Sequence, residues 1–339
     1  MGRRILPDKT SMLRTALPEL GRIQDPVRGR LDQLYQTLGD LIVDEFELID
    51  EVNDYLLLKR GKLFRPTLLL LSNEVGGKPS GEALTLAAVV EAVHLATLVH
   101  DDAVDHSVLR RGMPTVNTVW GHQVAIIMGD YLYSRSVMEM AKLQRVDVIG
   151  VLAEAANAMT IGEMRQLAMH DTLEFTEDDY YRLISAKTAS LMSAACELGS
   201  MVGDSAWRER LKTYGFALGM AFQVVDDILD YVGTEDVTGK PSGHDLREHK
   251  VTLPLIVALR NFDQDQRLAV NALFADPEPD DEAILRVVEA TTAAGGVDYA
   301  RAQARAFADE ALAALEGLPE SPAAAALAEA VNYTIERRQ

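Results

Sequence analysis

Apolar residues recur at every third or fourth position along most of the chain, and almost no stretch alternates as a half-buried strand would. This spacing predicts long, mostly buried helices in the segments 86–100, 124–143, 153–171, 185–203 and 215–233. Short stretches rich in glycine, proline and acidic residues interrupt the pattern at 76–81, 233–243, 276–282 and 317–322. The chain is therefore predicted to be all-α, a single domain of roughly ten or more helices.

The two ends of the chain complete this outline. Residues 26–339 are assigned to the helical domain, with a first helix expected around 26–56. The alanine-rich region from 284 onward predicts amphipathic helices packed outside the core. Residues 1–25 are expected to be an N-terminal segment that is free to be flexible.

Composition and cysteine usage narrow the class of protein. The 339 residues are 48% hydrophobic and 25% charged, which is typical of a globular protein. A single cysteine, Cys196, excludes an intramolecular disulfide and fits a reducing compartment. The N-terminus lacks the apolar run of a signal peptide, and no 18-residue stretch is free of charge, so we expect a cytoplasmic protein.

The net charge of −19 disfavours nucleic acid as a partner. It would also repel anionic small molecules unless metal ions or local basic clusters intervene.

The stretch HLATLVHDDAVDHSVLRRG, 94–112, places three carboxylates on one turn of an otherwise apolar helix. Asp101 and Asp105 are four residues apart and share a face, with Asp102 beside them. Like charges at this spacing destabilise a helix by roughly 0.2–0.5 kcal/mol per pair, and apolar flanks add a desolvation cost. A solvated acidic turn at a helix end is the alternative explanation for this motif alone.

The same spacing recurs in FQVVDDILD, with Asp226, Asp227 and Asp230 inside another apolar helix. Two such helices facing each other would offer six carboxylates to shared cations. A thiolate or imidazole metal would need more cysteine or histidine, and a di-iron bundle would need the Glu-x-x-His pattern that occurs only at Glu91–His94. Oxygen ligands with room for water and phosphate favour Mg²⁺.

Basic residues beside the aspartate turns and the chain breaks support a phosphate ligand. They are Lys62 and Arg65 in GKLFRP, Arg110 and Arg111 after the first turn, Lys187 in SAKTAS, Lys240 in TGKPSG and Lys250 in HKVTLP. Each is by itself more often a surface cation.

Together these motifs resemble the trans-isoprenyl (polyprenyl) diphosphate synthase family, and within it the long-chain, octaprenyl-type enzymes. The match runs from GKLFRP near 61 through both aspartate turns, GDYLYSRS, GEMRQL, SAKTAS and GKPSGHDL to KVTLPL near 255. The resemblance implies an all-helical bundle with a deep central cavity, a homodimer, and Mg²⁺-dependent condensation of isopentenyl diphosphate with an allylic diphosphate of the farnesyl or geranylgeranyl type. It also implies three Mg²⁺ per active site, with Mn²⁺ as an alternative ion.

The resemblance further implies a role for each matched residue. Two Mg²⁺ would be held by Asp101, Asp102 and Asp105, and the third by Asp226, with weaker contributions from Asp227 and Asp230 and support from Asp245. The allylic diphosphate would contact Arg110, Lys187 and Lys240. The diphosphate of isopentenyl diphosphate would bind Lys62, Arg65, His94 and Arg111. The developing allylic cation would lie near Thr188 and Gln223. One departure is His249, where many relatives carry glycine.

Product length is predicted from the residues that precede the first aspartate. Short-chain members carry large aromatics four or five residues before it, whereas this chain has Thr97 and Ala96, and Val93 continues the face. The helix over 84–100 would be roughly 25 Å long. We therefore expect a long-chain product that serves as a quinone side-chain precursor and leaves through transient membrane contact. A bulky side chain from another helix, such as Met128, Tyr131 or Tyr133, could instead close the tunnel.

The alternatives are a short-chain synthase that makes farnesyl or geranylgeranyl diphosphate, a terpene cyclase, and a non-catalytic subunit. A cyclase would need a second metal motif of the Asn/Asp-x-x-Ser/Thr-x-x-x-Glu type, where this chain has DDILD. A non-catalytic subunit would tolerate loss of the aspartates, yet all six are present.

Overall fold

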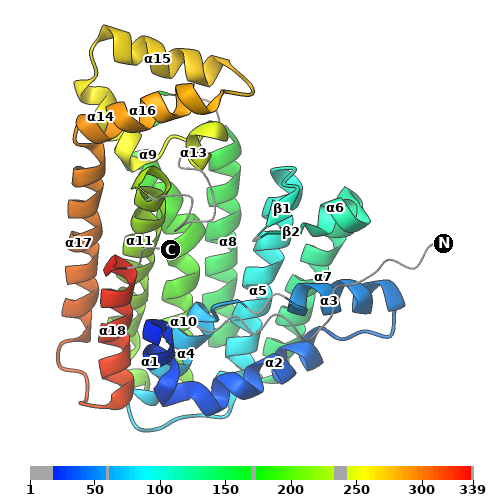
Figure 1. The fold of residues 1–339 in the computed structure, drawn as a ribbon. Coiled ribbons are helices and arrows are strands. Elements are labelled where there is room, and N and C mark those ends of the chain that lie inside the picture. The colour runs from blue at the N-terminus through cyan, green and yellow to red at the C-terminus, as the bar shows by residue number, and fades with distance from the viewer. Residues whose placement is uncertain (1–17, 59–60, 111, 169–172, 233–242, 337–339) are drawn as a thin grey trace.

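A computed structural model describes residues 18–58, 61–110, 112–168, 173–232 and 243–336, and most of them lie in helices (Figure 1). The N-terminal half contains α1 (Pro18–Gln24), η1 (Asp25–Val27), α2 (Arg28–Ile42), α3 (Glu47–Leu58), α4 (Phe64–Glu74), α5 (Glu82–Val104), β1 (Leu109–Arg110), β2 (Met113–Pro114), α6 (Val116–Trp120), α7 (His122–Lys142) and α8 (Val146–Ala168). The C-terminal half contains α9 (Glu177–Ile184), η2 (Ser185–Ala189), α10 (Ser190–Val202), η3 (Ser205–Trp207), α11 (Arg208–Val232), α13 (His244–Arg247), α14 (Leu253–Asn261), α15 (Gln264–Ala275), α16 (Asp281–Ala293), α17 (Gly296–Leu315) and α18 (Pro322–Glu336). The all-α prediction is confirmed.

Helix α5 lies at the centre of the bundle and packs against α2, α4, α7 and α10 (Figure 1). By length and composition alone it could cross a membrane. Most of its apolar residues are buried against those neighbouring helices, from Ala83 and Leu86 through Val93 to Val99. Its hydrophobicity is therefore explained by its position in the core.

The helix expected around 26–56 is two helices, α2 and α3, separated at 43–46. Helix α2 ends because its last carbonyls are bound by side chains from elsewhere. The Ile42 carbonyl accepts hydrogen bonds from Asn53 Nδ2 (2.6 Å) and from the Tyr131 hydroxyl (2.9 Å), and the Leu41 carbonyl accepts one from Arg135 Nε (2.7 Å). Such contacts satisfy carbonyls that would otherwise continue the helix.

The C-terminal helices belong to the core, and the expectation that they pack outside it was wrong. Helix α17 lies along α11 over much of its length (Figure 1). Its Ala300, Ala304 and Ala308 are buried in that contact. Alanines at a spacing of four let two helix backbones approach closely, so this face contributes to the core despite its small side chains.

At the N-terminal end, α1 packs against α18, with Leu20 and Ile23 buried. The domain limit at residue 26 stays a prediction.

The hairpin β1–β2 is a local exception to the helical fold. Arg110 pairs with Met113, and Leu109 with Pro114. The hairpin directly follows the first aspartate turn.

Candidate active site

Both aspartate turns lie at the C-terminal ends of long helices. Asp101 and Asp102 are in the last turn of α5, and Asp105 caps it; Asp226, Asp227 and Asp230 occupy the last two turns of α11. The C-terminus of a helix carries partial negative charge, so carboxylates there are electrostatically unfavourable unless cations are near. A cation bound at either turn would therefore be stabilised both by the carboxylates and by the negative end of the helix.

In the first turn, each carboxylate has a different environment. Asp102 is buried and accepts a hydrogen bond from Arg110 Nε at 2.7 Å, while Asp105 is exposed. Burial, together with Glu163 and Asp105, raises the pKa of Asp101 to about 6, although Lys187 and Arg110 oppose the shift. Burial is the largest cause of this shift, so the ionised form of Asp101 would be stabilised by a further cation nearby.

The second turn repeats this arrangement. Asp226 is exposed, whereas Asp227 is buried and accepts hydrogen bonds from the Tyr180 hydroxyl (2.5 Å) and from Gln223 Nε2 (2.9 Å). Burial and the nearby carboxylates of Asp245 and Asp226 raise the pKa of Asp227 well above its usual range.

Asp230 anchors the segment that follows α11 in space. Its two carboxylate oxygens accept the backbone N–H groups of His244 and Asp245, each at 3.0 Å. These N–H groups belong to the first turn of α13, where they have no partner within the helix. Asp230 thereby fixes Asp245 beside the second turn, and burial together with Asp230 raises the pKa of Asp245 to about 7.

Lys187 lies between acidic groups of two helices. Its Nζ atom is 2.7 Å from Glu163 Oε2, 3.1 Å from Gln166 Oε1 and 3.8 Å from Asp101 Oδ2. The other oxygen of Glu163 is buried and has no hydrogen-bond partner among the described residues.

Lys250 approaches the site from the segment after α13. It donates a hydrogen bond to Glu248 (2.6 Å), which also contacts His244 (3.2 Å). Burial lowers the pKa of Lys250, but the carboxylates of Glu248 and Asp245 outweigh burial and raise it. Lys250 also lines the pocket beside Asp227, and the charge of Asp105 contributes to its raised pKa.

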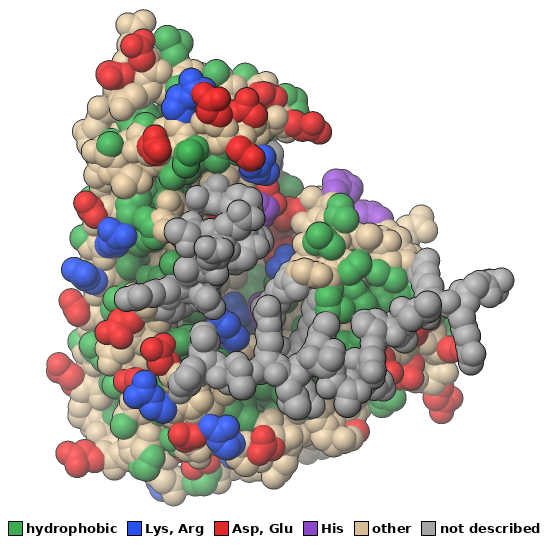
Figure 2. All heavy atoms as spheres, viewed as in Figure 1, with side chains coloured by type: hydrophobic (Ala, Val, Ile, Leu, Met, Phe, Trp, Pro, Cys, Tyr) green, Lys and Arg blue, Asp and Glu red, His purple; other side chains and the backbone are tan. Residues whose placement is uncertain are grey.

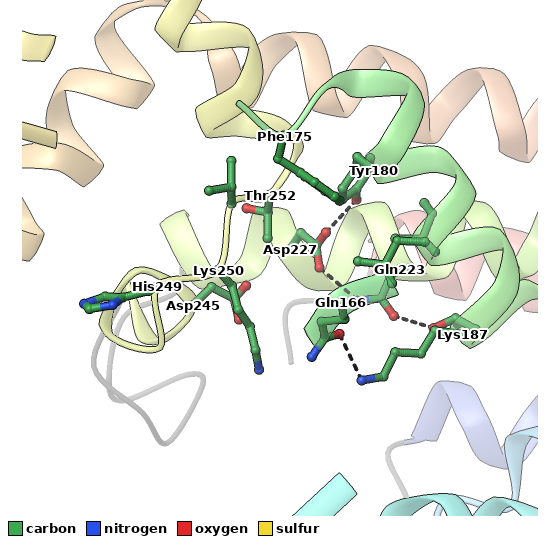
Figure 3. A pocket seen from close by; sticks show the side chains of 14 residues that line it. Gln166, Phe175, Tyr180, Lys187, Gln223, Asp227, Asp245, His249, Lys250 and Thr252 are labelled. Carbon is green, nitrogen blue, oxygen red and sulfur yellow. Dashed lines mark hydrogen bonds between the residues drawn. The ribbon is translucent and has the colours of Figure 1, made fainter. Parts of the chain in front are cut away.

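A pocket of about 220 Å³ opens beside the second turn (Figure 3). Its polar lining includes Lys187, Thr188, Gln223, Asp227 and Lys250, which come from η2, α11 and the segment after α13. Apolar side chains complete its wall, namely Phe175, Leu183, Ile184 and Val251. In the space-filling view the molecule is hollowed between the part that carries α13 and the part that carries β1 and α6 (Figure 2).

A π-helical turn, η2, brings Lys187 and Thr188 to this pocket. Two glycines make room for it: a Cβ at Gly162 of α8 would lie 3.0 Å from Ala186 Cβ, and one at Gly219 of α11 would lie 2.6 Å from Ala189 Cα. Isolated π turns are rare in proteins as a whole, but those that occur are often found at functional sites. The motif SAKTAS thus inserts between α8 and α11.

Arg65 and His94 were both predicted to bind the second diphosphate, and the structure brings them together. Arg65 Nη1 lies 3.1 Å from His94 Nε2, linking the start of α4 to α5. Lys62 is exposed just before α4, and its carbonyl accepts a hydrogen bond from Gln24. Arg111 and Lys240 lie outside the described residues.

The chain-length positions lie on the core side of α5. Val93 and Ala96 are buried, and the Thr97 hydroxyl donates a hydrogen bond to the His94 carbonyl at 2.8 Å. Met128 packs with Val99 and Ala103, which lie on the opposite face of the helix from Asp101.

The other two candidates for a tunnel floor have different positions. The hydroxyl of Tyr131 is bound at the Ile42 carbonyl, and Tyr133 is 37% exposed. The side chain of Tyr131 also packs against the apolar cluster that contains Val93 and Ala96.

The donor set fits a hard divalent cation. Every candidate ligand is a carboxylate, and Asp101, Asp227 and Asp245 all have raised pKa values because they are buried near like charges. Among the residues that the structure describes, no three acidic, histidine or cysteine side chains converge to hold an ion alone. This suits an ion that takes its remaining ligands from phosphate and water.

The chain was compared with known proteins. Residues 46–291 match the family model described as polyprenyl synthetase. The chain belongs to the polyprenyl synthetase family.

Members of this family that it resembles include octaprenyl diphosphate synthase of Escherichia coli, 36% identical over 86% of this chain and 91% of that protein. A crystal structure of a decaprenyl diphosphate synthase from Rhodobacter capsulatus has a TM-score of 0.89 and 34% identity, covering 94% of this chain and 99% of that one. A crystal structure of a polyprenyl synthase from Caulobacter crescentus, complexed with calcium and isoprenyl diphosphate, has a TM-score of 0.89 and 31% identity. The match covers 96% of this chain and 100% of that one. The protein is thus a prenyltransferase.

Several residues of this prenyltransferase site had no role assigned from sequence. Glu163 and Gln166 lie in GEMRQL, a motif that by itself predicts no specific contact for them. Tyr180 carried no signal, because an aromatic residue on an amphipathic helix is usually core. Phe175, which precedes that helix, belongs to no motif that the sequence offered.

Proposed function

We propose that this chain is a Mg²⁺-dependent trans-polyprenyl diphosphate synthase. It condenses isopentenyl diphosphate with an allylic diphosphate, of the farnesyl or geranylgeranyl type, and repeats the reaction to give a long all-trans chain. The observation that carries the proposal is the pocket in which Lys187, Thr188 and Gln223 lie between the two aspartate turns.

In this proposal the first turn and Asp226 of the second turn would hold Mg²⁺, which when bound would neutralise charge on the allylic diphosphate and so favour its departure. Arg110, Lys187 and Lys250 add positive charge beside the same group. Lys187 is held by Glu163 and Gln166, so it is positioned before the substrate arrives.

Cleavage of the C1–O bond leaves a carbocation next to the departing diphosphate. The oxygens of Thr188 and Gln223 place partial negative charge there. The double bond of isopentenyl diphosphate, held through Arg65 and His94, attacks C1 and forms the new C–C bond. The resulting cation loses a proton to the departing diphosphate. Apolar wall residues such as Phe175 and Ile184 exclude the water that would quench the cation.

A long product is supported by the small side chains that precede the first aspartate. Ala96 and Thr97 stand where short-chain members of the family carry large aromatics. The product would serve as a quinone side-chain precursor, and transient membrane contact would assist its release.

A homodimer is supported by the outer face of α7. Its Ile126, Ile127 and Met138 are 41%, 62% and 53% exposed, although all three are large apolar side chains. We propose that a second copy of the chain covers this face.

Product analysis tests the proposal directly. The purified protein is incubated with farnesyl diphosphate, labelled isopentenyl diphosphate and Mg²⁺, and the dephosphorylated products are sized. A ladder ending at one long polyprenol supports the chemistry and the open tunnel. A stop at about twenty carbons or fewer, roughly four isoprene units, would keep the chemistry and favour the short-chain alternative. No extension would point to a missing subunit or overturn the proposal.

A further inference from the structure

In each aspartate turn the middle carboxylate is buried and already bound by the protein. Asp102 accepts from Arg110, and Asp227 accepts from both Tyr180 and Gln223. Asp226, by contrast, is exposed. The two adjacent aspartates of the second turn therefore have different surroundings, although their sequence positions look equivalent.

The hydrogen bonds at Asp227 continue into the pocket in one direction. The NH₂ group of Gln223 donates to Asp227 Oδ1 at 2.9 Å. The carbonyl oxygen of that amide then faces the other way, where it accepts the hydroxyl of Thr188 at 2.7 Å. Every proton along Thr188–Gln223–Asp227 thus points toward the buried carboxylate.

This direction has an electrostatic consequence. The hydroxyl hydrogen of Thr188 is engaged by Gln223, so the lone pairs of Thr188 Oγ1 are left for the pocket. Hydrogen bonds in series polarise one another, and here a carboxylate stands at the end of the series. The lone pairs of Thr188 Oγ1, which carry partial negative charge, are therefore directed toward the place where the allylic cation would develop.

Tyr180 completes the arrangement from α9. Its hydroxyl donates to Asp227 Oδ2 at 2.5 Å, and the side chain is 2% exposed in the cluster that includes Ile184, Met220 and Val224. Because the Tyr180 side chain is buried, its hydroxyl restrains the carboxyl group to which it donates. With Tyr180 on one oxygen and Gln223 on the other, Asp227 has little freedom to rotate toward a metal ion.

We propose that Tyr180 is a positioning residue of the prenyl-transfer reaction, and that Asp227 anchors Thr188 and Gln223 instead of binding Mg²⁺. Tyr180 acts through Asp227 and Gln223 on the Thr188 oxygen and does not touch the substrate. The inference rests on the proposed function, since it concerns the cation formed in that reaction. It replaces the metal-binding role predicted for Asp227 from its motif.

The experiment compares two neighbouring tyrosines. Tyr180→Phe removes the hydroxyl that holds Asp227, and Tyr181→Phe removes one that donates to Glu177 instead, away from the pocket lining. We expect Tyr180→Phe to lower kcat roughly 10- to 100-fold, the scale of a misplaced catalytic group. KM for both substrates and the Mg²⁺ concentration for half-maximal rate should stay within about twofold. Tyr181→Phe should leave all of these values unchanged.

A double-mutant cycle separates positioning from a merely structural role. If Tyr180 acts through Thr188, Tyr180→Phe should cost little further activity in a Thr188→Val background. Thr188→Ser, which keeps the hydroxyl, should retain most of the rate. Equal and independent losses in both backgrounds would overturn the inference, as would a kcat unchanged by Tyr180→Phe.

The role of Asp227 is tested by Asp227→Asn against Asp226→Asn. We expect Asp226→Asn to raise the Mg²⁺ requirement strongly, and Asp227→Asn to lower kcat at an unchanged Mg²⁺ requirement. A raised requirement in both variants would show that Asp227 binds metal and would overturn the inference. If Tyr180→Phe does not fold, the comparison of Asp227→Asn with Asp226→Asn still tests the inference. A wild-type protein without prenyl transfer would instead refute the proposed function.

Discussion

Lys187 and Glu163 form an ion pair in which Nζ lies 2.7 Å from Oε2. The same ammonium group is 3.8 Å from the carboxylate of Asp101. One positive charge thus faces two carboxylates, and Glu163 is among the groups that raise the pKa of Asp101 to about 6. Without added cations, this part of the site is electrostatically unfavourable to the fold.

The metal-free protein should therefore become more stable as the pH falls from about 8 to about 5, a range set by the usual carboxyl pKa. Asp101 and Asp245 have folded-state pKa values of about 6 and about 7, above the usual 3.8, so the native state binds their protons more tightly than the unfolded state does. Stability is gained as they protonate and lost as the pH rises through those values. Chemical denaturation across this range measures the trend.

A matched variant and a ligand check this origin. Asp101→Asn should remove part of the pH dependence and stabilise the metal-free protein at pH about 8 by on the order of 1–3 kcal/mol, while abolishing activity. Mg²⁺ with inorganic pyrophosphate should raise the melting temperature of the wild type at the same pH. A metal-free stability that decreases as the pH is lowered from about 8 to about 6 would contradict the electrostatic argument.

Glu163→Gln should shift the acid limb of activity to lower pH. The substitution removes a negative charge that raises the pKa of Asp101, so this carboxyl ionises at lower pH and protons compete less with Mg²⁺ for it. The measurement is the Mg²⁺ concentration for half-maximal rate at several pH values. An acid limb that stays in place, or moves upward, would show that another group controls it.

Replacement of Ala96 and Thr97 by Phe should shorten the product. Two aromatic rings in place of small side chains would fill the space beside α5 in which the growing chain is expected to lie. Tyr133→Phe, at a side chain that is 37% exposed, is the control and should leave product length unchanged. Chromatography of the dephosphorylated products measures the effect. An unchanged length in the double variant would place the tunnel elsewhere.

Substitutions of His249 should separate backbone strain from side-chain anchoring. His249 has a φ of +51°, stacks on Phe274 with ring centroids 5.4 Å apart, and donates from Nε2 to the Asp276 carbonyl at 3.0 Å. His249→Ala loses the anchors and keeps the left-handed backbone, whereas His249→Gly also relieves the strain. We expect His249→Ala to be less stable than His249→Gly by about 1 kcal/mol.

The neighbouring Lys250 provides a second readout for these variants. Because His249 fixes the segment that carries Lys250, both substitutions should raise KM for the allylic diphosphate. Equal stabilities of the alanine and glycine variants in urea would argue that the left-handed conformation costs little here.

Detergent or lipid vesicles should raise the steady-state rate. Each added isoprene unit buries about five carbons, on the order of 3–4 kcal/mol of hydrophobic stabilisation, so a long product should leave slowly. A burst of product in the first turnover, followed by a slower rate that vesicles accelerate, is the expected result. A steady-state rate insensitive to both additives would mean that release does not limit turnover.

The sequence by itself determined the helical class and the two aspartate turns. Apolar spacing of three and four leaves a helix as the structure that buries one face, so α5, α7, α8, α10 and α11 were predictable as elements. The aspartate spacing gave the chemistry, because like charges on one face need a cation.

The tertiary structure decided what no local pattern encodes. Helix α2 ends where Asn53 and Tyr131 bind its last carbonyl, and α17 joins the core because its alanines meet α11. Most clearly, Asp226 and Asp227 are adjacent and chemically identical, yet one is exposed and the other is bound by Tyr180 and Gln223. The difference arises because Tyr180 lies 47 residues away in the sequence, and burial and hydrogen bonding depend on neighbours in space.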